Sequence, residues 1–187
     1  HTQTLLEIDP DNRIMRLRDH AIALQGIAKL EARLDPYESL QKYDTVVGVY
    51  ESLITLDPAN VRAPRDLAIA LSRRGKLKLK MNQLESGVQD IEDAADLFIQ
   101  RALISDQDPV AQRELKDWLL HFANIFDGTQ FAPRMRVVLE SAIDQLQHIA
   151  DTGRRTGDST WSSILRKLDE RAKQLPTSVE DDTSESS

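Results

Sequence analysis

The stretch Arg65-Asp66-Leu67-Ala68-Ile69-Ala70-Leu71 occurs almost unchanged 47 residues earlier, as Arg18-Asp19-His20-Ala21-Ile22-Ala23-Leu24. Six of the seven positions are identical between the two copies. A match of this length indicates an internal repeat, and a repeat decides the architecture of a chain before any other feature. We interpret the matching alanine, isoleucine and leucine positions as residues that stack the repeated units on one another.

Aspartate-proline pairs recur along the chain at intervals close to the repeat length. They stand at Asp9-Pro10, Asp57-Pro58 and Asp108-Pro109, so the prolines are 48 and 51 residues apart. We interpret each pair as the end of a helix, because proline cannot continue the hydrogen-bond ladder and restricts the residue before it. The third unit keeps a drifted copy of the repeated stretch, at Lys116-Asp117-Trp118. The sequence therefore predicts three units of about fifty residues each.

Each unit is predicted to consist of two helices. In the first unit, Asp35 suits the capping position of a helix that starts at Pro36. The apolar residues of this helix follow the spacing of one helical stripe, at Leu40, Tyr43, Val47, Tyr50 and Ile54. The predicted helices cover about 13–33, 36–56, 62–81, 110–126 and 133–151, and a further helix begins near Leu84.

The predicted fold is all-α: a right-handed α-solenoid of about three antiparallel helix hairpins plus a C-terminal capping helix. The hairpins cover about 11–58, 59–109 and 110–151, after the tail of a preceding repeat at 1–10. A linker at 151–158 leads to the capping helix at 158–175, and residues 176–187 are predicted to form a disordered acidic tail. The apolar face of the capping helix is predicted to hold Trp161, Ile164, Leu165, Leu168 and Ala172. We interpret the chain as the C-terminal part of a longer protein.

Composition argues against several classes of protein. The chain has 187 residues and a formal net charge of −7, so we expect no nucleic-acid partner, because phosphate binding needs clustered Lys and Arg. No apolar run approaches the ~18–20 residues of a membrane span. Cysteine is absent, which excludes disulfides and thiolate zinc sites, and no glycine-rich phosphate loop or catalytic motif is found. We therefore expect no cofactor, no enzymatic activity and a cytoplasmic location.

Residues 61–81 form a basic strip in this acidic protein. Its seven cations are Arg62, Arg65, Arg73, Arg74, Lys76, Lys78 and Lys80, against the single acid Asp66. The strip could bind an acidic peptide or a phosphate, or it could pair with the acidic residues at 84–98, and exposed charges more often do the latter. The candidate binding residues are Arg65, Arg73, Arg74, Lys76 and Lys80. We interpret the strip as unique to the second unit, because Gly26 and Ile27 take the places of Arg73 and Arg74.

Two other sets of polar residues are weaker candidates for chemistry. Asp90, Asp93 and Asp96 recur every third residue and could hold a magnesium ion, but no second acidic cluster faces them in the sequence. The four histidines show no metal-ligand spacing. His20 takes the place of Leu67 in the repeat, so we predict that it is packed or half-buried.

The two tryptophans, Trp118 and Trp161, lie on apolar stripes. We predict that both pack in the interior. The alternative is a partner-binding hot spot, because tryptophan is enriched in such positions.

The second unit has a recognisable order of residues: Leu67-Ala68 and Gly75 in its first helix, Ala94-Ala95 in its second, and a closing Asp108-Pro109. The end of the first unit is similar, at Tyr50-Glu51-Ser52-Leu53 and Leu56-Asp57-Pro58-Ala59-Asn60. This order resembles the tetratricopeptide repeat (TPR), although the unit is longer than the family's repeat of about 34 residues. It is more similar to the long variety that is often appended to bacterial Ser/Thr kinases and signalling ATPases.

The resemblance implies a fold and a function. In the family, the place of Gly75 is small so that the partner helix can approach closely, and Ala28 and Phe126 take that place in the first and third units. The family implies a scaffold for protein–protein interaction, with no chemistry of its own. Its first helices line a concave groove, which would bind a segment of a partner.

We expect this chain to be a binding module for a protein or peptide, with an acidic partner favoured by the basic strip. The alternative is a regulatory or oligomerisation arm of a multidomain kinase or signalling ATPase, with self-association through the N-terminal repeat edge. A helical metal-dependent enzyme is a remote third hypothesis, supported only by the aspartates at 90, 93 and 96.

Overall fold

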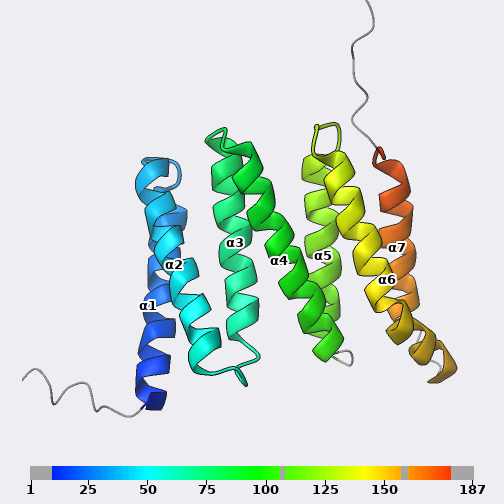
Figure 1. The fold of residues 1–187 in the computed structure, drawn as a ribbon, viewed down its shortest axis with the longest axis horizontal. Helices are drawn as coiled ribbons and strands as arrows, with labels where there is room; N and C mark the ends of the chain where they lie inside the picture. The colour runs from blue at the N-terminus through cyan, green and yellow to red at the C-terminus, as the bar shows by residue number, and fades with distance from the viewer. Residues whose placement is uncertain (1–9, 106–107, 157–159, 178–187) are drawn as a thin grey trace, which may run out of the picture. The chain divides into compact units, whose positions relative to one another are not determined.

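The computed structural model describes residues 10–105, 108–156 and 160–177. All regular elements in these ranges are α-helices, which confirms the all-α prediction (Figure 1). They are α1 (Pro10–Glu31), α2 (Pro36–Leu56), α3 (Ala63–Lys80), α4 (Leu84–Ile104), α5 (Pro109–Phe126), α6 (Ala132–Thr156) and α7 (Thr160–Gln174). The chain divides into two compact units, one up to Leu97 and one from Phe98, so the boundary lies within α4. From here on, the first and second units are these two, and the predicted units of about fifty residues are called repeats.

The helix starts confirm one capping prediction and correct the interpretation of the aspartate-proline pairs. The Glu38 backbone N–H donates to Asp35 Oδ1 at 2.9 Å, and α2 begins at Pro36. Asp108 caps α5 in the same way, so Asp108-Pro109 begins a helix, and Pro10 is likewise the first residue of α1. Proline suits the first helical position because the N–H that it lacks would have no partner there. Asp57-Pro58 directly follows the end of α2 at Leu56, as predicted.

The C-terminal half corrects a second boundary. The predicted linker at 151–158 is helical as far as Thr156, because α6 continues through the glycine at position 153. Residues 1–9, 157–159 and 178–187 lie outside the described residues, and with them most of the predicted N-terminal tail, the end of the linker and the acidic tail.

In the first unit, successive helices run antiparallel, with α2 packed against both α1 and α3 (Figure 1). The two helix pairs cross at small residues. Ser39 Oγ donates to the Ala28 carbonyl at 2.7 Å where α1 meets α2. Where α3 meets α4, a Cβ on Gly75 would lie 2.7 Å from the Gly87 carbonyl oxygen. The close approach predicted at Gly75 is therefore confirmed.

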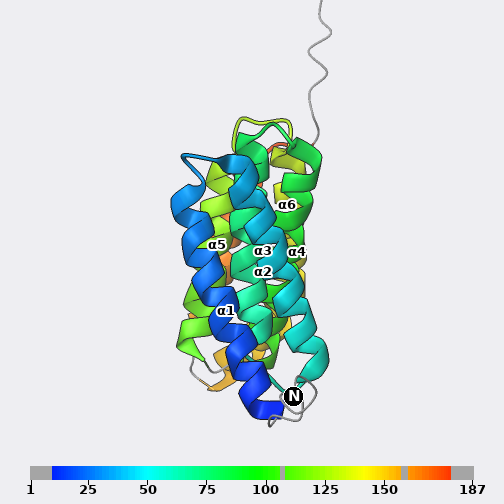
Figure 2. The ribbon, with the colours of Figure 1, turned by 90° about the vertical axis from the view of Figure 1, so that its left-hand side faces the viewer.

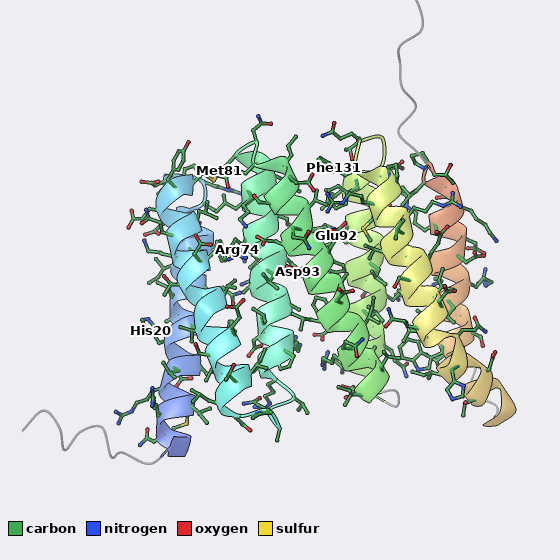
Figure 3. The ribbon with its side chains drawn as sticks, viewed as in Figure 1. His20, Arg74, Met81, Glu92, Asp93 and Phe131 are labelled. Carbon is green, nitrogen blue, oxygen red and sulfur yellow. The ribbon has the colours of Figure 1, made fainter. Side chains whose placement is uncertain are left out.

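The two copies of the repeated stretch are joined by an ion pair. Arg18 Nε donates to Asp66 Oδ2 at 3.1 Å, so the arginine of the first copy meets the aspartate of the second. The copies differ in burial, and here the prediction for His20 is wrong. His20 is exposed and points away from the neighbouring helices (Figure 3), whereas Leu67, at the same place in the repeat, is buried. In this unit α3 lies between α2 and α4, whereas α1 is the outermost described helix (Figure 1), so the side on which His20 lies is open.

In the second unit, α7 packs against both α5 and α6. The predicted apolar face of α7 is buried throughout, and Trp161 is 1 % exposed, which confirms its packing role. Trp118 lies between Phe98 and Phe122, with ring centroids 5.5 and 4.4 Å away. The Arg171 guanidinium fixes α7 to the end of α5, because it donates to the Ala123 carbonyl at 3.0 Å and to Asp127 Oδ2 at 2.9 Å.

Candidate functional site

The basic strip of α3 separates into faces with different neighbours. Arg74 and Lys78 are four residues apart and meet Asp90 of α4. Arg74 donates through Nε and one terminal nitrogen to the two oxygens of Asp90, both at 2.8 Å, and it also donates to Asp44 at 3.0 Å. Lys78 Nζ lies 2.9 Å from Asp90 Oδ2. For these two cations, pairing with the acidic helix is therefore the correct alternative.

The ion pairs of Arg74 indicate a structural role, and the shift of its pKa agrees with that role. Burial of the guanidinium disfavours its charge, but the hydrogen bonds and charge of Asp90, with Asp44, outweigh burial and raise the pKa of Arg74. Figure 3 shows Arg74 on the side of α3 that faces α2. A cation that is fully paired in this way is a poor candidate for ligand binding, so Arg74 is no longer a candidate binding residue.

Arg73, Lys76 and Lys80 occupy another face of α3, where they line a pocket of about 300 Å³. Lys29 of α1 and Arg33 of the turn after α1 complete its basic lining. The remaining lining residues are Ala32, Tyr43 and Leu77, so α1, α2 and α3 all contribute. We call this pocket, with its five cations and no acidic lining residue, the cationic pocket.

The cations of the cationic pocket act on one another. Burial, and then the charges of Lys80 and Arg73, lower the pKa of Lys76. Burial raises the pKa of Tyr43, and the nearby charge of Arg73 opposes that shift. A lysine whose charge is disfavoured by its neighbours marks a place where a bound anion would be stabilised. The buried faces of Tyr43 and Leu77 provide an apolar floor below these charges.

Sequence reasoning missed Lys29 and Arg33, although the repeat contained a signal for them. Lys29 lies 47 residues before Lys76, and Arg33 lies 47 residues before Lys80. Two positions of the basic strip are therefore repeated, which corrects the interpretation that the strip is unique to the second repeat. The cations at these places gather in one pocket because α1 and α3 run in the same direction, with their C-terminal ends together (Figure 1).

Arg65, the fifth predicted binding residue, does not line the cationic pocket. It lies on the first turn of α3, where its guanidinium is 3.6 Å from Asp66 Oδ1. Asp66 also accepts from Arg18, so Arg65 belongs to the contact between the repeated stretches. Of the five predicted residues, the structure thus brings together Arg73, Lys76 and Lys80.

The acidic residues of α4 do not converge. Asp90 is engaged by Arg74 and Lys78, and Asp93 accepts from Gln89 Nε2 at 2.9 Å. Burial, and then the charges of Asp93 and Glu92, raise the pKa of Asp96. Within residues 10–105, 108–156 and 160–177, no group of three or more His, Asp or Glu side chains could hold a metal ion.

A scan against protein-family models gave no match, and comparisons with curated proteins and with solved structures gave none either. In the described part of the chain, no helix is both long enough and apolar enough to cross a membrane.

Proposed function

We propose that this chain is a protein–protein interaction module whose cationic pocket binds an acidic segment of a partner protein. The observation that carries the proposal is the pocket itself: five cations drawn from α1, the turn after it and α3, with no acid in the lining. In a protein with a net charge of −7, such a local excess of positive charge needs a reason. The proposed frame is a right-handed TPR-like α-solenoid of three hairpins and a capping helix.

The chemistry of the pocket selects a short acidic segment. Carboxylates bound by Arg and Lys form charge-assisted hydrogen bonds, which are about twice as strong as neutral ones. The arginines of the pocket can take a carboxylate in bidentate fashion. The apolar floor at Tyr43 and Leu77 would accept one apolar side chain beside the acids. The overall negative charge disfavours a nucleic acid, whose long backbone would meet the acidic surface beyond the pocket.

Part of the basic lining has a second physical reason. Lys29 and Lys80 stand in the last turns of α1 and α3, where the helix dipole favours cations. Arg73, however, lies in the middle of α3, and no helix end accounts for its charge. Arg73 and Lys76 are therefore the residues on which the binding proposal depends most.

A probe peptide tests the proposal. We expect a labelled peptide of glutamates interspersed with leucine to bind the whole chain at low salt, with a Kd of about 10–100 μM. The double change Arg73→Glu and Lys76→Glu should abolish binding in fluorescence anisotropy. A matched control, Arg166→Glu with Lys173→Glu on α7, alters the net charge equally on exposed residues and should retain binding.

The outcomes of this titration are distinct. Equal loss in both double variants would reduce the effect to net charge and would remove the pocket from the model of binding. A peptide with glutamine in place of glutamate should not bind. Thermal melting of each variant checks that the fold is retained.

A second candidate function is a regulatory or oligomerisation arm of a cytoplasmic kinase or signalling ATPase of bacterial type. The observation that favours it is the uncovered apolar side of α1, where Met15, Ile22, Ile27 and Leu30 are exposed. Light scattering of the purified chain tests the self-association that this function requires.

A further inference from the structure

Among the residues that the structure describes, none covers the face of α1 that corresponds to the packing face of α3. In α3, Ala70 and Leu77 are buried, and Leu77 packs in a cluster with Ala28 and Tyr43. Their counterparts 47 residues earlier are Ala23 and Leu30, both exposed. Leu77 is 4 % exposed, whereas Leu30 is 76 % exposed. In Figure 2, no helix of the first unit lies in front of α1.

Apolar residues occupy two sides of α1. Ala21 and Ala28 are buried in the first unit, while Met15, Ile22 and Leu30 are exposed. A helix that is apolar on more than one side is typically covered on more than one side. Exposed apolar residues that form a continuous surface mark interaction sites, in contrast to single ones scattered over a protein.

The exposed residues of α1 follow a symmetric order about Gly26. Ile22 and Leu30 stand four residues on either side of it, and Asp19 and Arg33 seven. These offsets place the residues along one side of α1 and the turn after it. All four are exposed, and a Cβ on Gly26 would meet nothing within 4 Å. We call this set the α1 stripe.

A second copy of the chain fits the α1 stripe when the two helices lie antiparallel. A two-fold axis at Gly26 brings Ile22 against the partner's Leu30. The same axis brings Asp19 against the partner's Arg33, with opposite charges. The missing Cβ at Gly26 lets the two backbones approach at the centre. In a parallel arrangement, Asp19 would face the partner's Asp19, and like charges would oppose the pairing.

We propose that the chain forms a symmetric dimer through the α1 stripe, with the two copies of α1 antiparallel. The interface is isologous, as in most two-fold dimers, because each side contributes the same residues. It is limited to one helix and a turn per copy, so it belongs to the small class of interfaces and to micromolar association. The observations behind this inference are separate from the cationic pocket, with which the α1 stripe shares one residue, Arg33.

Sedimentation velocity of the whole chain, from about 1 to 200 μM, tests the dimer. We expect a shift from monomer to dimer within this range. Ile22→Glu with Leu30→Glu should leave the chain monomeric throughout. Val137→Glu, an exposed apolar residue of α6, should leave dimerisation unchanged. Circular dichroism confirms that each variant is folded.

A charge exchange tests the antiparallel register. Asp19→Arg and Arg33→Asp should each weaken the dimer at least tenfold, because each places like charges together. The double variant restores opposite charges and should recover most of the affinity. A wild-type chain that stays monomeric at the highest concentration would overturn the proposal. So would a dimer that is indifferent to Ile22→Glu and Leu30→Glu, or a double charge exchange that fails to recover.

Discussion

The helix pairs α1–α2 and α3–α4 each have an ion pair at the same place in the repeat. In one pair the first helix carries the acid, and in the other it carries the base. Between α1 and α2, Lys42 Nζ lies 2.8 Å from Glu31 Oε2. Between α3 and α4, Lys78 Nζ lies 2.9 Å from Asp90 Oδ2. Glu31 and Lys78 are 47 residues apart, and Lys42 and Asp90 are 48 apart, so the residues are counterparts in the repeat. Both copies of the repeat thus have an ion pair at this place, but the acidic and basic residues have exchanged helices.

Burial separates the two ion pairs. Asp90 is 3 % exposed, whereas both members of the first pair keep contact with solvent. The buried carboxylate has a second cation, Arg74, whose counterpart in the first pair is Ile27. Removing a carboxylate from water costs several kcal/mol, and one partner rarely offsets that cost. We infer that Arg74 stabilises the buried charge of Asp90. This role is not evident from the sequence, where Arg74 is one of several neighbouring cations.

Removing the buried charge should have the largest effect. Asp90→Asn keeps the shape of the side chain but takes the carboxylate away from Lys78 and leaves Arg74 with Asp44 alone. We therefore expect the free energy of unfolding to fall by about 3–5 kcal/mol. The matched change Glu31→Gln should cost less, because Lys42 stays partly solvated and also donates to Glu38 at 2.6 Å. Urea unfolding of both variants provides the comparison. Equal losses would show that burial does not distinguish the two pairs.

The pH dependence of stability gives the second test. Burial, and then the charge of Asp66, raise the pKa of Tyr50 to about 12, and its counterpart in the second helix pair is Phe98. An unfolded tyrosine loses its proton near pH 10, so the folded state binds more protons between pH 10 and 12. The contribution of Tyr50 is therefore complete below pH 10 and is lost as the pH rises toward 12, by roughly 2 kcal/mol.

Tyr50→Phe should reduce this alkaline loss of stability, as measured by urea unfolding at several pH values from 9 to about 12. Part of the loss should remain, because burial also raises the pKa of Tyr43. Tyr37→Phe, which changes an exposed tyrosine of the same helix, is the control. An unchanged slope in Tyr50→Phe would contradict the assignment.

The crossing of α3 and α4 gives the smallest expected change. A Cβ on Gly75 would stand 2.7 Å from the Gly87 carbonyl oxygen, so Gly75→Ala forces the two backbones apart. Overpacking costs about 1–3 kcal/mol, and the better helix propensity of alanine returns about 1 kcal/mol. We therefore expect a net loss near 1 kcal/mol. Gly48→Ala, on an open side of α2, should instead raise stability by about 0.5–1 kcal/mol.

These two glycines can be compared by their melting temperatures in one experiment. Ala28 already stands at the counterpart of Gly75, where Ser39 faces it in place of Gly87. A stabilised Gly75→Ala would show that α3 and α4 can separate as far as α1 and α2 at no cost.

The helices and their caps could be predicted from local sequence, because a cap such as Asp35 and a stripe such as Tyr43 and Val47 involve only near neighbours. The place of Gly75 was predictable from the resemblance, since its size matters for one crossing. The direction of Arg74 and the exposure of His20 were not. Both depend on which helix lies opposite, and the repeat indicates the place of a residue without indicating whether a neighbour covers it.

The candidate site divides in the same way. Arg73, Lys76 and Lys80 could be selected from their charge and spacing on one helix. Lys29 and Arg33 are brought to them only by the packing of α1 beside α3. The offset of 47 residues marks these two as counterparts of Lys76 and Lys80, so a systematic comparison of the repeats would have found them.

The exchanged ion pair has a consequence for the path by which the chain folds. Similar helices that lie close in sequence can form the wrong pairs during folding, and such traps slow or divert repeat proteins. If α1 took the place of α3 against α4, Glu31 would meet Asp90. If α3 took the place of α1 against α2, Lys78 would meet Lys42. Both errors bring like charges together at the crossing, whereas both native pairs bring opposite charges together. We therefore expect the exchanged signs to favour the native helix pairs over these two alternatives during folding.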